Sequence, residues 1–165
     1  MQKVNHLQDK WWNVVFSLTA LLVVAADQLS KIWISNNLDD GQSLPETGFF
    51  RLTRTHNTGA AFGIFQDQTL ALTIVALVSV VVLLLYALLI YRRFPILANR
   101  LGKSALGLVL GGTVGNLIDR LRLGYVTDFI DVGIWPTFNI ADSAVVVGVI
   151  ILAYSFLSVA KAEKR

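Results

Sequence analysis

Residues 69–91 read TLALTIVALVSVVVLLLYALLIY, a run of 23 residues without a single charge. As a helix that rises about 1.5 Å per residue, this run covers the roughly 30 Å of a bilayer's hydrocarbon core. A surface helix of a soluble domain needs a polar face, and this run has none. The stretch therefore predicts a transmembrane helix and places the chain among integral membrane proteins.

The composition of the whole chain agrees with a membrane protein. Of its 165 residues, 55% are hydrophobic and only 15% are charged, against roughly 25% charged residues in soluble domains. The length suits a single domain, which we take to be residues 1–165. Because the chain contains no cysteine, disulfides, thiolate metal ligands and a cysteine nucleophile are excluded.

Three further apolar stretches complete a predicted bundle of four transmembrane helices. They cover about residues 11–34, 104–121 and 141–160. The first stretch crosses the bilayer only if it continues through Asp27 and Lys31, and the second is short enough to draw Asp119 and Arg120 to the membrane boundary. A secretory signal peptide is the alternative for the first stretch, but no small-x-small cleavage site follows it.

The segments between the spans, 35–68 and 122–140, are predicted to lie outside the membrane. Residues 49–55 partly alternate apolar with polar side chains, which predicts short strands lying on the membrane. The second segment contains Trp135-Pro136, typical of an interfacial turn. The expected fold class is an all-α membrane protein with four transmembrane helices and a small extracytoplasmic β-sheet element.

The distribution of charge predicts the orientation of the bundle. Four spans put both termini on one side, and that side carries nine of the 14 basic residues, Lys103 among them, with only two acids. The positive-inside rule assigns that side to the cytoplasm. The net charge of +3 therefore reflects the orientation of the helices in the membrane and does not indicate an anionic partner such as a nucleic acid.

Polar residues gather at the outward ends of the predicted spans and in the outer segments. They are Asp27, Lys31, Asn57, Asn116, Asp119, Arg120, Asp128, Asn139 and Asp142. Ionisable residues at membrane depth are costly, so each is a functional hypothesis by default. Together they predict one site near the outer face.

Structural explanations stand beside this hypothesis for several of these residues. Asp27 and Lys31, four residues apart, could simply neutralise each other on one helical face, and adjacent charges at 119 and 120 could form a structural ion pair. Asn139 and Asp142 have the spacing of a capping box.

Glycines and a histidine in the same regions have structural explanations too. Gly107, Gly111 and Gly115 recur at the small-xxx-small spacing that favours close helix packing and nothing catalytic. His56 has no partner apparent in the sequence, so we expect a solvated or structural role.

The chemistry that fits these residues best is a pair of aspartates, Asp128 and Asp142. Two carboxylates held close share a proton, so that one activates water while the other protonates the peptide group, without a covalent intermediate. Asp142 would begin a helix, whose dipole favours the carboxylate, so we expect the shared proton on Asp128. No spacing typical of a metal site, a P-loop or a dinucleotide fold appears, so no cofactor is expected.

Two functions of other classes remain open. A proton- or ion-coupled small membrane transporter also uses intramembrane Asp, Lys and Asn, but it needs polar groups through the full thickness of the membrane. A non-catalytic scaffold protein would need the glycine-rich helix face but not two separate aspartates.

Five short runs resemble the ordered motifs of the bacterial lipoprotein signal peptidase family, also called signal peptidase II. The runs are Asp27-Gln-Leu-Ser-Lys31, Asn57-Thr-Gly-Ala-Ala-Phe-Gly63, Gly112-Thr-Val-Gly-Asn-Leu-Ile-Asp-Arg120, Val126-Thr-Asp-Phe129 and Phe138-Asn-Ile-Ala-Asp-Ser143. The resemblance covers nearly the whole chain and implies an aspartic endopeptidase that cleaves signal peptides from diacylglyceryl-modified prolipoproteins. It also implies sensitivity to globomycin-type inhibitors.

The resemblance further assigns roles to individual positions. By matching motif positions, Asp128 and Asp142 would be catalytic. The supporting or substrate-binding positions would be Asp27, Lys31, Asn57, Asn116, Asp119, Arg120 and Asn139. A lipid-modified prolipoprotein and membrane lipids are the partners that this family implies.

Overall fold

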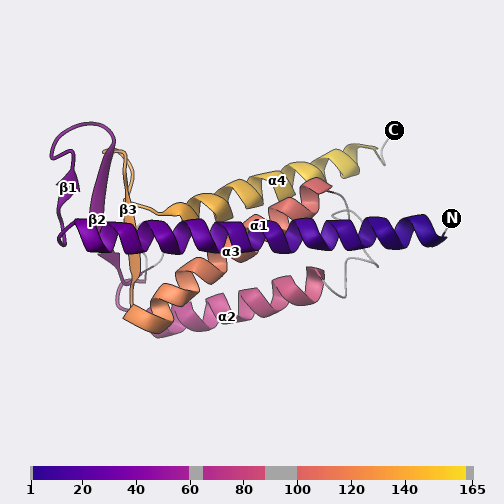
Figure 1. Ribbon diagram of the computed structural model, residues 1–165, viewed down its shortest axis with the longest axis horizontal. Coiled ribbons are helices and arrows are strands. Elements are labelled where there is room, and N and C mark those ends of the chain that lie inside the picture. The colour runs from indigo at the N-terminus through magenta and orange to yellow at the C-terminus, as the bar shows by residue number, and fades with distance from the viewer. Residues whose placement is uncertain (1, 60–64, 88–99, 163–165) are drawn as a thin grey trace.

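The computed structural model describes residues 2–59, 65–87 and 100–162. Its helices are α1 (Gln2–Asn37), α2 (Thr69–Leu85), α3 (Arg100–Leu123) and α4 (Ile140–Ala162). Its strands are β1 (Ser43–Leu44), β2 (Arg51–Asn57) and β3 (Val126–Asp131). Figure 1 shows the helices running along the long axis, the sheet at one end of them, and both termini at the other.

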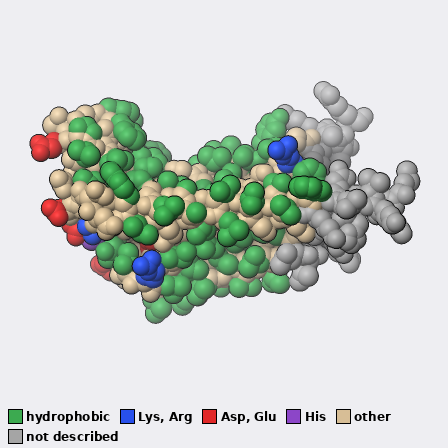
Figure 2. Space-filling model, viewed as in Figure 1, with side chains coloured by type: hydrophobic (Ala, Val, Ile, Leu, Met, Phe, Trp, Pro, Cys, Tyr) green, Lys and Arg blue, Asp and Glu red, His purple; other side chains and the backbone are tan. Residues whose placement is uncertain are grey.

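Three of the described helices are long and apolar enough to cross a membrane: residues Trp11–Asn37 of α1, all of α3, and Ile140–Ser158 of α4. Helix α2 begins at Thr69, as the sequence predicts, and its 17 residues are apolar. The predicted end of that span, at residues 88–91, lies outside the described residues. Large apolar side chains cover the outside of the helices, as expected of a surface that faces lipid (Figure 2).

Helix α3 is longer than the sequence predicted, because charged residues at both of its ends belong to the helix. With 24 residues it is one of the three helices that qualify as spans. Lys103, assigned by its charge to the cytoplasmic side, is fully buried. Its ammonium donates to the side chain of Asn13 at 3.1 Å and to the carbonyl of Ala87 at 2.9 Å. This cation therefore joins three helices.

Glycines bring α3 against its neighbours. A Cβ placed at Gly107 would lie 2.7 Å from the carbonyl oxygen of Phe16, and one at Gly111 would lie 2.7 Å from that of Ala20. On the other side of α3, a Cβ at Gly112 would collide with the carbonyl of Ala141 at the start of α4. The prediction of close packing is confirmed for Gly107 and Gly111, and α3 contacts each of the other three helices.

The sheet is antiparallel in the order β1-β2-β3. Strand β2 overlaps the stretch predicted to be extended, whereas β3 lies in the outer segment 122–140, for which no strand was predicted. The pairing of β2 with β3 places Thr55 opposite Asp128 and Asn57 opposite Val126. Asp128 thus lies on a strand and not in a loop, which fixes its position far more firmly than the sequence suggested.

The sheet is attached to the helices by an apolar contact and by an arginine. Ile34 and Leu38 at the end of α1 are buried against Phe129 of β3. Arg54 of β2 donates to the carbonyls of Ser35 at 3.1 Å and Leu38 at 3.0 Å, which satisfies acceptors that a helix end leaves unpaired. The outer end of α1 and the sheet therefore form one packed unit.

We predict that Gly111→Ala destabilises the protein by about 1–2 kcal/mol. The new methyl group would meet the backbone of α1, and overpacking of this kind costs typically 1–3 kcal/mol, more than the gain in helix propensity of up to about 1 kcal/mol. Thermal unfolding in detergent measures the change. The control is Ile150→Ala, since that side chain is 61% exposed; equal losses in the two variants would contradict the close packing of α1 and α3.

Candidate active site

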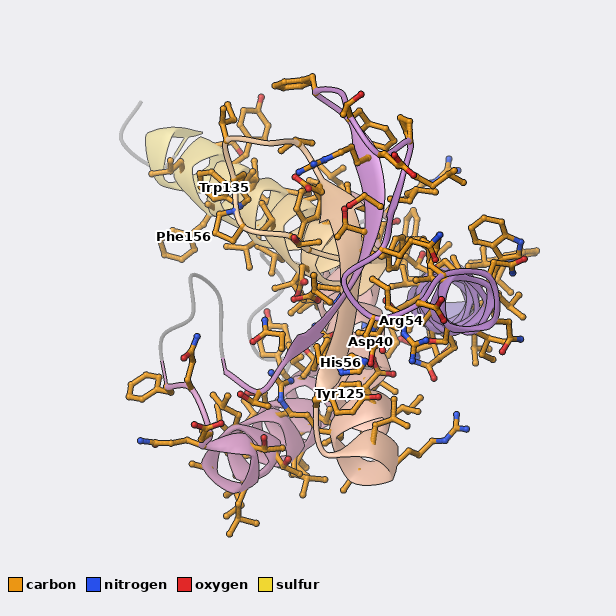
Figure 3. All side chains as sticks on the ribbon, turned by 90° about the vertical axis from the view of Figure 1, so that its left-hand side faces the viewer. Asp40, Arg54, His56, Tyr125, Trp135 and Phe156 are labelled. Atoms are coloured by element: carbon orange, nitrogen blue, oxygen red, sulfur yellow. The ribbon has the colours of Figure 1, made fainter. Side chains whose placement is uncertain are left out.

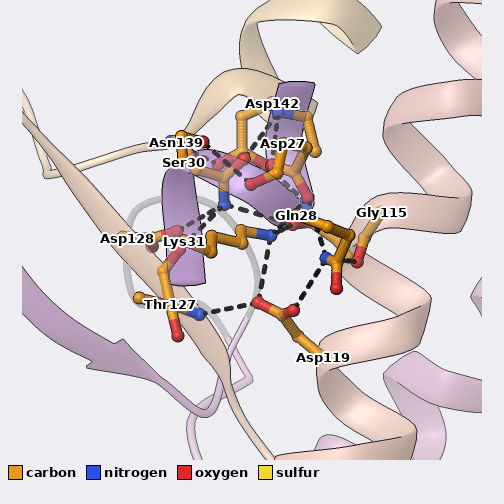
Figure 4. Close-up of polar contacts among 12 residues, drawn as sticks. Asp27, Gln28, Ser30, Lys31, Gly115, Asp119, Thr127, Asp128, Asn139 and Asp142 are labelled. Carbon is orange, nitrogen blue, oxygen red and sulfur yellow. Dashed lines mark hydrogen bonds and ion pairs between the residues drawn. The ribbon is translucent and has the colours of Figure 1, made fainter. Parts of the chain in front are cut away.

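The structure brings all nine predicted residues to the junction between the helices and the sheet. Asp27 and Lys31 come from α1, Asn57 ends β2, and Asp128 lies on β3. Asn116, Asp119 and Arg120 come from the last turns of α3, and Asn139 and Asp142 come from the start of α4. Figure 4 shows most of these side chains joined by hydrogen bonds and ion pairs.

Asp128 is almost completely buried, and amide groups hold both of its carboxyl oxygens. Asn139 Nδ2 donates to Oδ1 at 2.7 Å, and Asn57 Nδ2 donates to Oδ2 at 2.9 Å. The pKa of Asp128 is raised to about 7, first because burial disfavours the charged carboxylate and second because the carboxylate of Asp142 is close. Asp128 is therefore poised to carry a proton near neutral pH.

Asp142 lies in the first turn of α4 and forms a reciprocal capping box with Asn139. The backbone N–H of Asp142 donates to Asn139 Oδ1 at 2.9 Å, and the backbone N–H of Asn139 donates to Asp142 Oδ2 at 3.2 Å. Asn116 Nδ2 donates to the other oxygen, Oδ1, at 2.8 Å. The capping hypothesis is confirmed, and it does not compete with a functional one, because Asn139 also contacts Asp128.

The side chain of Asn139 links the two aspartates. It is fully buried, its oxygen accepts from the backbone of Asp142, and its nitrogen donates to Asp128. The same nitrogen lies 3.1 Å from Asn116 Oδ1. The two carboxyl groups therefore belong to a single hydrogen-bond network, in which one asparagine contacts both.

Lys31 forms ion pairs with two other carboxylates of the site. Its ammonium lies 2.9 Å from Asp27 Oδ2 and 3.0 Å from Asp119 Oδ2. The predicted pairing of Asp27 with Lys31 is confirmed. The predicted pairing of Asp119 with Arg120 is wrong, because neighbouring residues on a helix point in different directions and Asp119 turns towards Lys31.

Arg120 instead points to the chain after β2. Its guanidinium donates to the carbonyl of Gly59 at 3.1 Å, while its Nε is buried and makes no hydrogen bond within the described residues. The N–H of Gly59 in turn donates to Asn57 Oδ1 at 2.9 Å. Arg120 and Asn57 thus hold the same short segment beside Asp128.

Asp27 has a second role that the sequence did not reveal. Its Oδ1 accepts the backbone N–H of Ala141 at 3.0 Å, so a carboxylate of α1 caps the first turn of α4. A Cβ at Gly115 would lie 2.5 Å from Asp27 Oδ2. Gly115, expected only to allow helix packing, is thus needed to admit this carboxylate.

Two further contributors were missed. Gln28 Nε2 donates to Asp119 Oδ1 at 3.0 Å, and the backbone N–H of Thr127 donates to Asp119 Oδ2 at 3.0 Å. Gln28 lies inside the first motif run, so its place between Asp27 and Lys31 was the available signal. The contact of Thr127 is made by its backbone, which no side-chain pattern can reveal.

His56 has a structural role, one of the two expected for it, with partners that the sequence did not reveal. Its Nε2 lies 3.0 Å from Asp40 Oδ1, which also pairs with Arg54 at 2.9 Å. Its ring stacks on Tyr125 with a centroid separation of 3.9 Å. Figure 3 places this group on the α1 side of the sheet and Trp135 on the α4 side.

A cavity of about 900 Å³ adjoins the aspartates. Its polar end is lined by Asn57, Asn116, Arg120, Asp128 and Asp142. Its apolar part is lined by Ala76 and by the valines at 145, 146 and 147, and Trp135 and Pro136 lie along it. The cavity therefore has one polar and one apolar part.

No group of three or more His, Asp or Glu side chains in residues 2–59, 65–87 and 100–162 is arranged to hold a metal ion. The oxygens of the clustered carboxylates are instead engaged by Lys31 and by N–H donors.

The family model described as signal peptidase (SPase) II matches residues 19–158. The chain belongs to the signal peptidase II family. It is 51% identical over 145 residues to a lipoprotein signal peptidase of Dehalococcoides mccartyi, covering 88% of this chain and 90% of the relative. It is 49% identical over 152 residues to the lipoprotein signal peptidase of Moorella thermoacetica, covering 91% and 97%.

A solved structure agrees with the family assignment. A bacterial membrane enzyme, determined by the in meso method at 2.3 Å resolution, superposes with a TM-score of 0.75 at 32% identity, covering 86% of each chain. Signal peptidase II is a family of membrane peptidases, so the resemblance drawn from the five motif runs is confirmed, and the chain is assigned to the peptidases.

We predict that the protein loses stability as the pH rises from about 4 to about 7. A carboxyl whose pKa is about 7 when folded, against 3.8 ordinarily, binds a proton more tightly in the folded state. Its favourable contribution is therefore complete at low pH and disappears as Asp128 ionises, at a cost on the order of a few kcal/mol.

Thermal unfolding between pH 4 and pH 8 measures this dependence. Asp128→Asn removes the ionisation and should flatten the curve over this interval, whereas the control Asp39→Asn, at an exposed loop position, should leave it unchanged. A curve for Asp128→Asn as steep as that of the wild type would refute the raised pKa.

Proposed function

We propose that this chain is an aspartic endopeptidase that removes signal peptides from diacylglyceryl-modified prolipoproteins, with Asp128 and Asp142 as its catalytic pair and without a cofactor. The observation that carries the proposal is that Asn139 contacts both aspartates while both line one cavity at the outer end of the bundle. The family supports the substrate class, and the geometry supports the residues.

The two aspartates have surroundings that suit different roles. Asp142 accepts an N–H at each carboxyl oxygen and lies in the first turn of a helix, where the helix dipole stabilises negative charge. Asp128, whose pKa is about 7, holds the proton. The position of Asp142 at the start of a helix also predicts that the proton shared by the pair lies on Asp128.

Hydrolysis then needs only one water molecule. Asp142 takes a proton from water, and the oxygen of the water attacks the carbonyl carbon of the scissile peptide bond. Asp128 gives its proton to the carbonyl oxygen as the tetrahedral intermediate forms. When the C–N bond breaks, the leaving nitrogen takes up the proton held by Asp142, and a hydroxyl group of the intermediate returns a proton to Asp128. The substrate is at no stage bonded covalently to the enzyme.

The other residues of the site position the pair or the substrate. Asn57 and Asn139 hold Asp128, and Asn116 holds Asp142. Arg120 lines the same cavity as the two aspartates, so its guanidinium is placed to contact a substrate carbonyl. Asp27, Lys31 and Asp119 support the helix ends on which these residues lie.

The substrate's lipid explains why the site lies at the hydrocarbon edge. A diacylglyceryl-anchored cysteine cannot leave the bilayer, so the catalytic groups must be where water still reaches them. The apolar part of the cavity, including Val146 and Ala76, would take acyl chain, and each buried methylene contributes about 0.8 kcal/mol. Globomycin-type inhibitors would compete for the same cavity.

The protein would be a multi-pass protein of the bacterial inner membrane, with four spans and both termini in the cytoplasm. Both termini lie at the end of the bundle opposite the sheet (Figure 1), as four crossings require, and the excess of basic residues at that end fits the positive-inside rule. The proposal includes a crossing by α2, whose 17 described residues are all uncharged.

An ion-coupled transporter fits the structure less well. Between the polar site and the buried Lys103 at the other end, Gly107 and Gly111 press α3 against the backbone of α1. This contact leaves no room between these helices for a polar route through the membrane.

We predict that Asp128→Asn and Asp142→Asn each lower the rate of signal-peptide release by 10³-fold or more, a magnitude on the order of that found when a member of a catalytic unit is removed. The assay uses purified protein and a lipidated prolipoprotein. Asp131→Asn is the matched control, since this aspartate is on the same strand but pairs with Arg51. A variant of the pair that cuts at the wild-type rate excludes the assignment, and a wild type that releases no signal peptide excludes the enzyme.

The proposal also predicts how activity depends on pH. The reaction requires a protonated Asp128, so kcat should fall as the pH rises through about 7. Initial rates at saturating substrate between pH 5 and pH 9 give the profile, which reports the coupled pair as a whole. A rate that stays constant up to pH 9 would remove Asp128 from the role of acid.

A further inference from the structure

The ammonium of Lys31 has no hydrogen left over. It is 4% exposed and lies within 3.0 Å of three acceptors, namely Asp27 Oδ2, Asp119 Oδ2 and Asn116 Oδ1. An ammonium group carries three N–H donors, so each acceptor takes one. Two of the acceptors are carboxylates that pair with the cation, whereas the third is a neutral amide, which neutralising the cation does not require.

The contact with Lys31 decides which way the amide of Asn116 faces. Its oxygen accepts from Lys31 at 2.9 Å and from Asn139 Nδ2 at 3.1 Å, so its nitrogen is left to donate to Asp142 Oδ1 at 2.8 Å. Rotated by a half turn, the amide would place its N–H₂ against the ammonium and its oxygen against the carboxylate. Both contacts would then be repulsive.

We infer that Lys31 is a positioning residue for Asp142, because its ammonium fixes the amide of Asn116 in the one orientation that donates a hydrogen bond to this carboxylate. The inference rests on the proposed function, in which Asp142 activates water. Lys31 does not touch Asp142 itself. Its inferred effect on Asp142 passes through the side chain of Asn116 and is therefore open to a direct test.

A purely structural role would have a different signature. As half of an ion pair with Asp27, Lys31 would support α1 whatever residue stood at position 116, and its loss would cost the same with or without the amide. If Lys31 acts through Asn116, its loss matters only while the amide is present. A double-mutant cycle on kcat separates the two cases.

The cycle compares Lys31→Met, Asn116→Ala and the double variant, using signal-peptide release from a lipidated prolipoprotein. We expect Lys31→Met to lower kcat on the order of 100-fold with KM little changed, as for a displaced catalytic group. In the Asn116→Ala background the same substitution should cost less than about threefold.

The chain offers a matched control for the loss of a buried lysine. Lys103 is buried like Lys31 and, like Lys31, donates to an asparagine side chain. It donates in addition to the carbonyl of Ala87, and it lies at the other end of the bundle. Lys103→Met should lower thermal stability and leave the kcat of the folded protein within about threefold of the wild type.

Three outcomes would overturn the inference while the proposed function stands: equal costs of Lys31→Met in both backgrounds, a kcat loss in Lys103→Met as large as in Lys31→Met, or a wild-type kcat in Asn116→Asp. The last variant keeps an acceptor for Lys31 but has no N–H for Asp142, so it decides the matter even if Lys31→Met does not fold. A wild type that cleaves nothing would instead overturn the proposed function.

Discussion

The ammonium of Lys31 is removed from water between α1 and α3, and a buried cation persists only where its partners repay a desolvation cost of several kcal/mol. Those partners are Asp27, Asp119 and Asn116, and each makes a further contact. Asp27 caps α4, Asp119 receives the backbone of β3, and Asn116 reaches Asp142. The residues that stabilise this one buried ammonium therefore also fix the relative positions of three helices and a strand.

This dependence explains why the site is polar yet rigid. In a low-dielectric setting an unsatisfied donor or acceptor is expensive, and a fully satisfied network is correspondingly specific. The amides of Asn139, which is buried, and of Asn116, which is half-buried, each have two partners or more, so neither can rotate without breaking several hydrogen bonds. The amides that hydrogen-bond to the two aspartates are therefore fixed in place by further hydrogen bonds of their own.

Much of this arrangement could be predicted from the sequence. Uncharged runs predicted the helices, because burying the backbone in lipid leaves few alternatives, and ionisable residues at the ends of the runs predicted the site. The capping box at Asn139 and the pair of Asp27 with Lys31 followed from spacing within one helix.

What could not be predicted depends on contacts between distant segments. Asp119 turning to Lys31, Asp27 reaching Ala141, and His56 meeting Asp40 join residues on different elements. Strand β3 was missed because all of its residues but Ile130 are buried, with little of the alternation that identifies a half-exposed strand.

The short hairpin after β3 has a consequence for how this family could diversify. Ile130 and Phe138 pair across it, so the chain is closed before it reaches Asn139, and residues 132–137 hang outside the closed ring. Replacements there would reshape the rim around Trp135 and Pro136. Because the Ile130–Phe138 pairing lies between this loop and the two aspartates along the chain, the loop is the part of the cavity wall whose sequence can vary most freely.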